Sequence, residues 1–194
     1  MDNGKIRASI IGVGGYTGLE LLRLLIAHPN AEIAHLTARS VEGKTPIGDI
    51  APHLAGYDYA ATNTPHGEVA ANCDIVFLCL PHKTTAEIVP DIIGKCKIID
   101  LSADFRLKDK DIYKETYGLE HPCPELLKDF VYGLPEIYRE DIKGAENVAN
   151  PGCFALLTQL LLYPFRPPIK AAIVVSVTGS PGLGQGPLEA GHPP

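Results

Sequence analysis

Cys153 is the residue most able to do chemistry, because it follows Pro151-Gly152 directly and opens an apolar run over 154–163. That run has helical length, so we predict a helix from near Gly152 to just before Pro164. In a first helical turn, unpaired N–H groups and the helix dipole favour an anion. A thiol there ionises more readily, and the same N–H groups could hold an oxyanion formed by its attack on a carbonyl. The alternative is that Cys153 is a small buried hydrophobic residue.

A glycine turn near the amino terminus could hold a dinucleotide. Residues 6–11 are predicted to form a buried strand, and a helix follows over 19–27. Between them the spacing is G-x-x-G-x-x-G, with one additional glycine. The residues of this turn are Gly12, Gly14, Gly15, Tyr16, Thr17 and Gly18. A strand, a glycine turn and a helix N-terminus together are typical of a pyrophosphate-binding site, although a purely structural turn is the alternative.

The end of the second predicted strand, at 32–37, should show which dinucleotide is preferred. An acidic residue there would bind the ribose of NAD, but this chain has Arg39 and Ser40 instead. An Arg beside a hydroxyl suits the 2′-phosphate of NADP, so the position favours NADP over a reading of Arg39 as a solvated side chain.

Two further predicted strands, over 74–80 and 97–101, end in residues that could contact ligands. Leu80 and Pro81 end the first strand, and ligands of open α/β sheets gather at such carboxyl ends. Past the second strand come Ser102 and Arg106, which are plausible contacts for an anion. A surface ion pair between Asp104 and Arg106 is the alternative for this segment.

Composition narrows the class of protein. The 194 residues are 45% hydrophobic and 21% charged, with a net charge of -6 and no strong basic block, so a nucleic-acid partner is not expected. No apolar run approaches membrane-spanning length, and no signal-peptide pattern is present, so we expect a cytoplasmic protein. The five scattered cysteines predict reduced thiols, and neither a disulfide framework nor a metal site.

The remaining segments complete an α/β pattern. We predict short helices over 66–72 and after 132–136, a helix over 83–93, a last strand of the first domain over 146–149, and a further strand over 171–178. The segment 41–65 is expected to be irregular, with a short strand at 57–60, and 108–144 is expected to wrap the surface. The predicted fold is a Rossmann-type, doubly wound parallel sheet in a domain over 1–150. The start of a second domain would occupy 151–194.

Five short motifs follow one another along the chain: Gly15-Tyr16-Thr17-Gly18, Leu80-Pro81-His82, residues 100–106, Tyr132-Gly133-Leu134-Pro135-Glu136 and Asn150-Pro151-Gly152-Cys153. In this order they resemble the N-acetyl-γ-glutamyl-phosphate reductase family, and the resemblance runs from the first strand to about Gly184. The family is similar in plan and chemistry to aspartate-semialdehyde dehydrogenase. The second domain would then be an α/β catalytic domain like that of glyceraldehyde-phosphate dehydrogenase.

The resemblance implies a cytoplasmic, NADP-dependent oxidoreductase of arginine biosynthesis. In such an enzyme Cys153 would attack an acyl phosphate and form a thioester, which hydride from NADPH would reduce to a semialdehyde. It also implies a substrate contact at Asn150, a turn near the nicotinamide at Ser180 and Gly182, and a homo-oligomer.

The chain departs from the family after that turn. The family's second domain carries a histidine, in a His-x-His stretch, that acts as general acid/base, and His192 does not match that motif. We therefore expect a truncated product with poor solubility or dependence on a partner fragment. Three functions stay open: the reductase itself, a non-catalytic NADP-binding remnant, and a related reductase acting on aminoadipyl or aspartyl phosphate.

Overall fold

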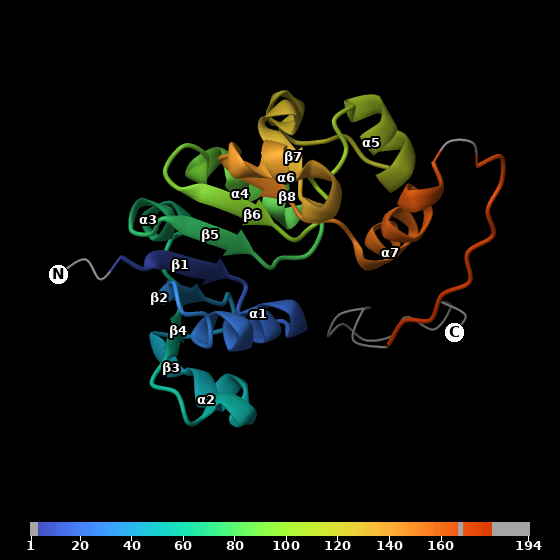
Figure 1. Cartoon of the computed structure of the whole chain (residues 1–194). Helices are drawn as coiled ribbons and strands as arrows, with labels where there is room; N and C mark the ends of the chain where they lie inside the picture. Colours follow the sequence, from blue (N-terminus) through green and yellow to red (C-terminus); the bar gives the residue numbers. More distant parts are fainter. Residues whose placement is uncertain (1–3, 167–168, 180–194) are drawn as a thin grey trace, which may run out of the picture.

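The structure is a computed structural model that describes residues 4–166 and 169–179 (Figure 1). Its centre is one eight-stranded sheet with the order β3-β4-β2-β1-β5-β6-β8-β7. All neighbouring strands are parallel except β3 and β4. The strands are β1 (Ile6–Ile11), β2 (Ala31–Thr37), β3 (Lys44–Pro46), β4 (Ala60–Thr62), β5 (Ile75–Leu78), β6 (Lys97–Asp100), β7 (Phe130–Tyr132) and β8 (Asn147–Ala149). The predicted doubly wound parallel sheet is therefore confirmed.

Helices connect the strands and cover both faces of the sheet. The α-helices are α1 (Tyr16–Ile26), α2 (Ile47–Ile50), α3 (His66–Ala71), α4 (Thr84–Ile92), α5 (Lys110–Tyr117), α6 (Pro135–Lys143) and α7 (Cys153–Leu162). Three short 3-10 turns are η1 (Pro52–Leu54), η2 (Pro124–Asp129) and η3 (Tyr163–Phe165). In Figure 1, α1 and α2 lie on one side of the strands, and α3 and α4 lie on the other.

The core divides into two clusters because alternate residues of a strand point to opposite faces. Ile10 packs with Leu22 of α1 and Ile47 of α2, whereas Ile11 packs with residues of α3 and α4 such as Val69 and Val89. The second cluster is larger and continues through β5, β6 and β8 to Phe105 and Phe130, whose stacked rings lie 4.0 Å apart. These two clusters fix the carboxyl ends of the strands, where the candidate site lies.

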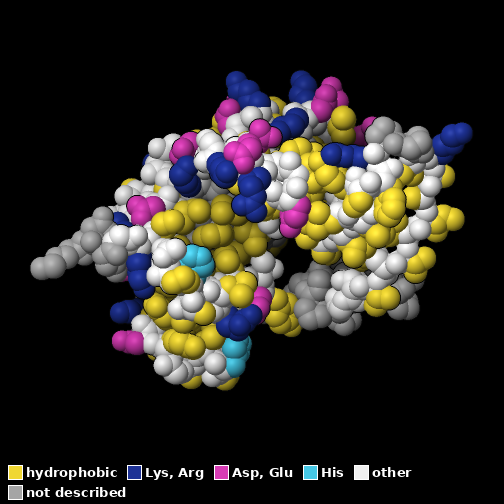
Figure 2. Space-filling view, in the orientation of Figure 1, with side chains coloured by type: hydrophobic (Ala, Val, Ile, Leu, Met, Phe, Trp, Pro, Cys, Tyr) yellow, Lys and Arg dark blue, Asp and Glu magenta, His cyan; other side chains and the backbone are white. Residues whose placement is uncertain are grey.

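One face of the sheet is only partly covered at β5, β6 and β8. On β5, β6 and β8 the residues that face away from α3 and α4, among them Phe77, Ile99 and Val148, are only half-buried. Figure 2 shows hydrophobic side chains gathered at the middle of this side of the molecule, and again over α7 and the segment after it. The described part of the chain therefore leaves a good deal of apolar surface in contact with water.

Three local predictions were wrong. The segment 171–178 has no regular secondary structure, and Ile173, Val175 and Val177 are at least 90% exposed, because no neighbouring strand within the described residues supplies backbone hydrogen bonds. The strand expected at 57–60 begins only at Ala60, after a loop. The segment 108–144 does not merely wrap the surface, because it adds α5 and the edge strand β7.

Candidate functional site

The glycine turn joins β1 to α1, and its glycines serve different purposes. Gly12 has a φ of +92°, and a Cβ on it would lie 2.3 Å from the carbonyl oxygen of Cys79. A Cβ on Gly18 would lie 2.4 Å from the Gly12 oxygen, so α1 can cross β1 this closely only with glycine there. A Cβ on Gly15 would meet only the Gly12 oxygen, at 3.9 Å, which leaves room above the turn.

The amino terminus of α1 fits a pyrophosphate. Gly15 is its N-cap, and no side chain in the described residues caps the helix there. Tyr16 and Thr17 are exposed in its first turn. Open glycine backbone before an uncapped helix start is the arrangement that binds phosphate oxygens. The residues present therefore fit a dinucleotide, although the contacts of each predicted residue stay predictions.

The end of β2 lies beside this turn. The Thr37 carbonyl accepts hydrogen bonds from the N–H groups of Gly12 and Val13, each at 2.9 Å, which holds the turn against β2. Arg39 and Ser40 follow and are exposed. Burial, and next the positive charge of Arg39, lower the pKa of His66 at the start of α3, so the guanidinium lies near that helix. An exposed cation beside the turn is what a 2′-phosphate requires.

The loop after β6 is built around two buried carboxyl groups. Burial raises the pKa of Asp100 to about 6, although its carboxylate accepts hydrogen bonds from the Ser102 N–H and hydroxyl, both at 2.8 Å. Ser102 is 2% exposed and also accepts from the N–H of Asp104 at 3.1 Å. Its hydroxyl is thus hydrogen-bonded within the loop. This geometry indicates that Ser102 holds the loop in shape, and it does not support the predicted contact with substrate.

Asp104 has a different role from the surface pair considered above. It is fully buried and accepts hydrogen bonds from the backbone N–H groups of Lys83 (2.9 Å) and Ala86 (3.1 Å), which caps α4. Tyr113 of α5 also donates its hydroxyl to this carboxylate, at 3.4 Å. Lys83 adopts a left-handed backbone, with φ of 76°. Sequence reasoning missed this cap because Asp104 follows Lys83 and Ala86, whose N–H groups it caps, by 21 and 18 residues.

His82 joins the ends of β5 and β6. Its Nδ1 accepts a hydrogen bond from the N–H of Ala103 at 2.9 Å. Leu80 is half-buried and Pro81 is exposed at the same strand end. The strand-end motif predicted to contact a cofactor is therefore fixed to the loop that carries Arg106.

Arg106 binds backbone rather than Asp104. Its Nε donates to the Asn150 carbonyl at 2.7 Å, and its Nη2 donates to the Leu101 carbonyl at 3.0 Å. A Cβ on Gly152 would lie 2.9 Å from Nη1, so the guanidinium lies directly against the turn before Cys153. Asn150 is half-buried, and its N–H donates to the Asp100 carbonyl at 2.7 Å. The structure thus brings Arg106, Asn150 and Cys153 together.

Cys153 is the first residue of α7, and Gly152 is the N-cap. Its side chain is exposed, so the alternative of a buried hydrophobic residue is wrong. Gln159 Nε2 donates to the Tyr132 hydroxyl at 2.8 Å, which links α7 to β7. Within the described residues α7 has no buried side chain, and Phe154, Leu157 and Leu161 are about half exposed. Ser180 and Gly182 lie outside the described residues.

Across residues 4–166 and 169–179, no helix is both long enough and apolar enough to cross a bilayer. The same residues contain no cluster of three or more His, Cys, Asp or Glu side chains suited to a metal ion.

Comparisons with known proteins agree with this geometry. The chain is 47% identical over 189 residues to a protein of Thermococcus kodakarensis assigned as a LysW-L-2-aminoadipate/LysW-L-glutamate phosphate reductase; the match covers 97% of this chain and 55% of that protein. It is 48% identical over 187 residues to an N-acetyl-gamma-glutamyl-phosphate reductase of Dehalococcoides mccartyi strain 195, covering 94% of this chain and 53% of the relative. The chain thus spans about half the length of these relatives.

Solved structures show the same fold. Aspartate semialdehyde dehydrogenase from Francisella tularensis matches with a TM-score of 0.57 and 19% identity, covering 82% of this chain and 40% of that one. The Candida albicans enzyme, solved with NADP, matches with a TM-score of 0.52 and 18% identity, covering 84% and 48%. Residues 7–145 match the family model described as semialdehyde dehydrogenase, NAD binding domain. The chain belongs to the semialdehyde dehydrogenase family, and most of it is that family's NAD-binding domain.

Proposed function

We propose that this chain is the cofactor-binding and nucleophile-bearing part of an NADPH-dependent acyl-phosphate reductase. The proposed reaction converts N-acetyl-γ-glutamyl phosphate to N-acetylglutamate semialdehyde and phosphate, in arginine biosynthesis in the cytoplasm. The observation that carries the proposal is the exposed Cys153 at the start of α7, with Arg106 against the preceding turn, on the same sheet edge as the glycine turn.

Each part of the edge has a proposed role. The turn from Gly12 to Gly18 and the start of α1 bind the pyrophosphate, and Arg39 with Ser40 selects the 2′-phosphate of NADP. Leu80 and Pro81 border the cofactor where β5 ends. The cofactor supplies hydride when it is bound. Ser180 and Gly182 are kept as proposed cofactor contacts on sequence grounds alone.

Cys153 begins the chemistry. Its thiolate attacks the acyl carbon, phosphate leaves, and a thioester on Sγ remains, which divides one difficult reduction into two easier steps. The N–H groups of the first turn of α7 hold the oxyanion that develops on the carbonyl oxygen. Arg106 adds a positive charge beside that turn and, with Asn150, orients the anionic substrate. After reduction, the tetrahedral adduct on Sγ collapses to release the aldehyde and restore the thiolate.

The acyl group is the least constrained part of the proposal. Relatives of nearly equal identity are assigned to N-acetyl-gamma-glutamyl phosphate and to LysW-bound aminoadipate or glutamate phosphate. Reduction of a carrier-bound acyl phosphate is therefore the second candidate function. We also propose that the enzyme is a homo-oligomer and that a second, catalytic domain begins near residue 151.

The reverse reaction tests the proposal. Purified chain is given NADP, N-acetylglutamate semialdehyde and phosphate, and NADPH formation is followed, while NADP binding is titrated separately. We expect Cys153→Ala to lose activity by about 10³-fold or more while NADP binding is retained. Leu161→Ala, an exposed change at the far end of the same helix, is the matched control and should retain activity.

The possible results separate the candidates. Turnover that survives Cys153→Ala would overturn the thioester route. Binding of NADP without turnover in the unchanged chain would favour a non-catalytic NADP-binding remnant. Turnover only with a carrier-bound aminoadipate semialdehyde would favour the second candidate.

A further inference from the structure

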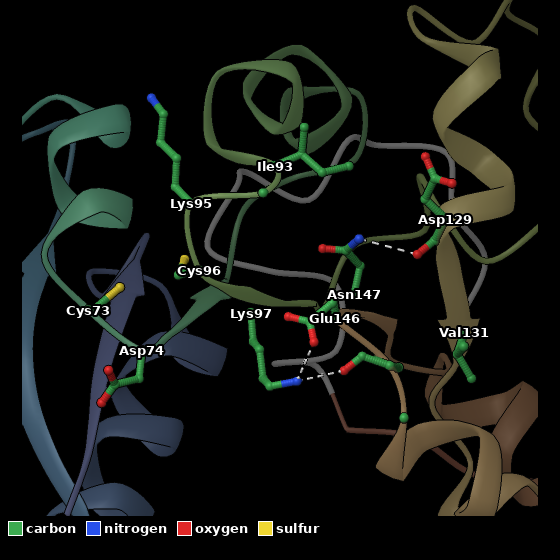
Figure 3. A pocket seen from close by; sticks show the side chains of 13 residues that line it. Cys73, Asp74, Ile93, Lys95, Cys96, Lys97, Asp129, Val131, Glu146 and Asn147 are labelled. Carbon is green, nitrogen blue, oxygen red and sulfur yellow. Dashed lines mark hydrogen bonds and ion pairs between the residues drawn. The ribbon is translucent and has the colours of Figure 1, made fainter.

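A pocket of ≈ 850 Å³ opens at the edge of the sheet opposite the candidate site (Figure 3). It lies where β5, β6 and β8 begin, and two cysteines, Cys73 and Cys96, contribute to its wall. Cys73 is 9% exposed, and Cys96 is half-buried. Neither thiol has a part in the chemistry proposed at the other edge.

The two thiols face each other. The side chains of Cys73 and Cys96 interact closely enough for each to shift the pKa of the other, and Figure 3 shows their sulfur atoms side by side. The Cys73 thiol also donates to the Ala70 carbonyl, at 3.9 Å. Each cysteine directly precedes a residue of the first backbone contact between β5 and β6, in which the Lys97 N–H donates to the Asp74 carbonyl at 3.0 Å. The register of β5 and β6 pairs Ile75 with Lys97, so Cys73 and Cys96 lie just before the two strands and are offset by one residue. A strand spacing of about 4.8 Å with an offset of one residue, about 3.3 Å, gives a Cα separation of about 6 Å, within the range found in disulfides.

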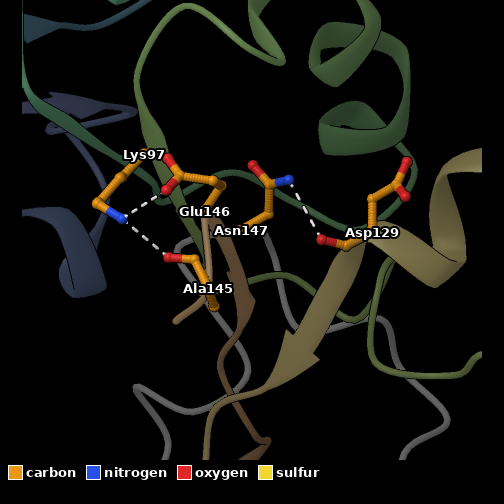
Figure 4. A network of polar contacts seen from close by, with 5 residues as sticks. All are labelled: Lys97, Asp129, Ala145, Glu146 and Asn147. Atoms are coloured by element: carbon orange, nitrogen blue, oxygen red, sulfur yellow. Dashed lines mark hydrogen bonds and ion pairs between the residues drawn. The ribbon is translucent and has the colours of Figure 1, made fainter. Parts of the chain in front are cut away.

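Both cysteines are held in place by their neighbours. On one side, the Arg7 N–H donates to the Asp74 carboxylate at 2.7 Å. On the other, Lys97 Nζ donates to the Ala145 carbonyl (3.0 Å) and to Glu146 (2.9 Å), as Figure 4 shows. Figure 4 also shows the amide of Asn147 donating to the Asp129 carbonyl at 3.2 Å, which fixes β8 to the start of β7. These contacts fix the backbone that follows each cysteine.

The surroundings make Cys73 the thiolate of the pair, because the contact between the two thiols lowers the pKa of Cys73 and, together with burial, raises the pKa of Cys96. The contact with Cys96 is the main cause that lowers the pKa of Cys73 to about 7, and the Ser9 hydroxyl and the charge of Arg7 act in the same direction. Burial raises the pKa of Cys79 to about 12 and that of Cys123 to about 11. A thiolate is the form that attacks an oxidant, so Cys79 and Cys123 are internal comparisons that should stay reduced.

We propose that Cys73 and Cys96 form a modification site for peroxides, at which the two thiols are joined in a reversible disulfide. The Cys73 thiolate attacks one peroxide oxygen, the O–O bond breaks, and Cys73 becomes a sulfenic acid while the other oxygen takes a proton and leaves as water. The Cys96 sulfur then attacks the Cys73 sulfur, the S–O bond breaks, and a second water leaves. The two sulfurs are oxidised, and both peroxide oxygens are reduced to water.

The disulfide would tie the junction between α3 and β5 to the junction between α4 and β6. It closes a loop that contains β5 and α4, and hence the Leu80-Pro81-His82 strand end. Closing such a loop restricts the unfolded chain, so oxidation should raise the midpoint of thermal unfolding by about 5 °C. Reduction by a dithiol should reverse the shift.

Peptide mapping of the peroxide-treated full chain tests the proposal. Free thiols are blocked after treatment with hydrogen peroxide, and the chain is cleaved on the amino side of aspartate without reduction. That cleavage separates the cysteines, because Cys73 falls in 58–73, Cys79 in 74–90 and Cys96 in 91–99. We expect 58–73 joined to 91–99 with the loss of two hydrogens, and 74–90 blocked as a free thiol.

Variants and a reductant complete the test. Cys96→Ser should abolish the joined peptide and the shift in unfolding temperature, whereas Cys79→Ser should retain both. Dithiothreitol should restore the two separate peptides. Three results would overturn the proposal: oxidation confined to Cys153, a disulfide between Cys73 and any other cysteine, or free thiols at both Cys73 and Cys96. Each of these results can be seen in the unchanged chain, so the test does not depend on whether a variant folds.

Discussion

Helices α1 and α7 begin alike and end differently. Each starts at a glycine N-cap on the carboxyl edge of the sheet, with no side-chain cap in the described residues. Yet α1 buries Gly18 and Leu22 against β1 and the first core cluster, whereas α7 buries none of its side chains. An anion-binding helix start thus needs little local sequence, but holding that start in place needs packing along the rest of the helix.

The difference predicts which half of the proposed reaction this chain supports better. The dinucleotide turn is fixed by contacts that lie entirely within residues 4–166, such as the bonds from Gly12 and Val13 to Thr37. The turn before Cys153 is fixed by Arg106, but the helix behind it relies on Gln159 and on apolar side chains that face water. We therefore expect the cofactor half of the proposed reaction to be the sturdier half.

Gly18→Ala should show the largest effect on the α1 side of this comparison. The new Cβ would lie 2.4 Å from the Gly12 oxygen and 2.7 Å from Val13 Cα, and both are backbone atoms that cannot move aside without shifting β1. We expect a loss of more than about 4 kcal/mol in the free energy of unfolding, together with loss of NADP binding. Chemical denaturation measures the first quantity, and ligand titration measures the second.

Gly14→Ala is the matched control, since its Cβ would make an ordinary contact of 3.7 Å with Ala38. Its stability should stay within about 1 kcal/mol of the unchanged chain. If the two variants lose equal amounts of unfolding free energy, then the cost comes from replacing a flexible glycine backbone. The close crossing of α1 over β1 would then not be the cause.

A pair of leucine truncations compares the two helices directly. Leu22 is fully buried on α1, and Leu157 is 46% exposed on α7. Leu22→Ala should lower the free energy of unfolding by about 3 kcal/mol, because it removes buried methyl groups and leaves a cavity. Leu157→Ala should change it by less than about 0.5 kcal/mol in this chain.

Urea titrations of the two variants measure both values. If Leu157→Ala costs as much as Leu22→Ala, then α7 is covered in solution, for instance by a second copy of the chain. Sedimentation of the same samples would identify that case, because the cost would then depend on protein concentration.

The sequence predicted the parts of the molecule whose reasons are local. The glycine turn, the strands β1, β2, β5 and β6, and the start of α7 at Cys153 each follow from periodicity and breakers within one segment. The cap of α4 by Asp104 was missed because the tertiary fold brings its partners to it. The hydrogen bond between Ser102 and Asp100 joins residues only two apart, so it was a local turn signal that the sequence analysis overlooked. Strand periodicity over 171–178 failed because a strand needs a neighbour that its own sequence does not supply.

The smallest predicted effect is a dependence of stability on pH that arises from Asp100, at the carboxyl end of β6. Its carboxyl group ends β6, is fully buried, and has its pKa raised by burial to about 6, against 3.8 for an exposed aspartate. The folded protein therefore holds this proton more tightly than the unfolded chain does. Its contribution to stability is present below about pH 4 and is lost as the pH rises to 6, with a slope of at most about 1.4 kcal/mol per pH unit.

Asp100→Asn should remove that slope, because the amide stays neutral at every pH. Unfolding free energies measured by urea titration between pH 4 and pH 6 should therefore converge with those of the unchanged chain at low pH and exceed them at pH 6. Asp58→Asn, at an exposed position, should keep the original slope. If Asp100→Asn keeps the same slope of stability against pH, then water reaches the carboxyl end of β6. The loop that carries Arg106 would then be more open to solvent than the burial of Asp100 implies.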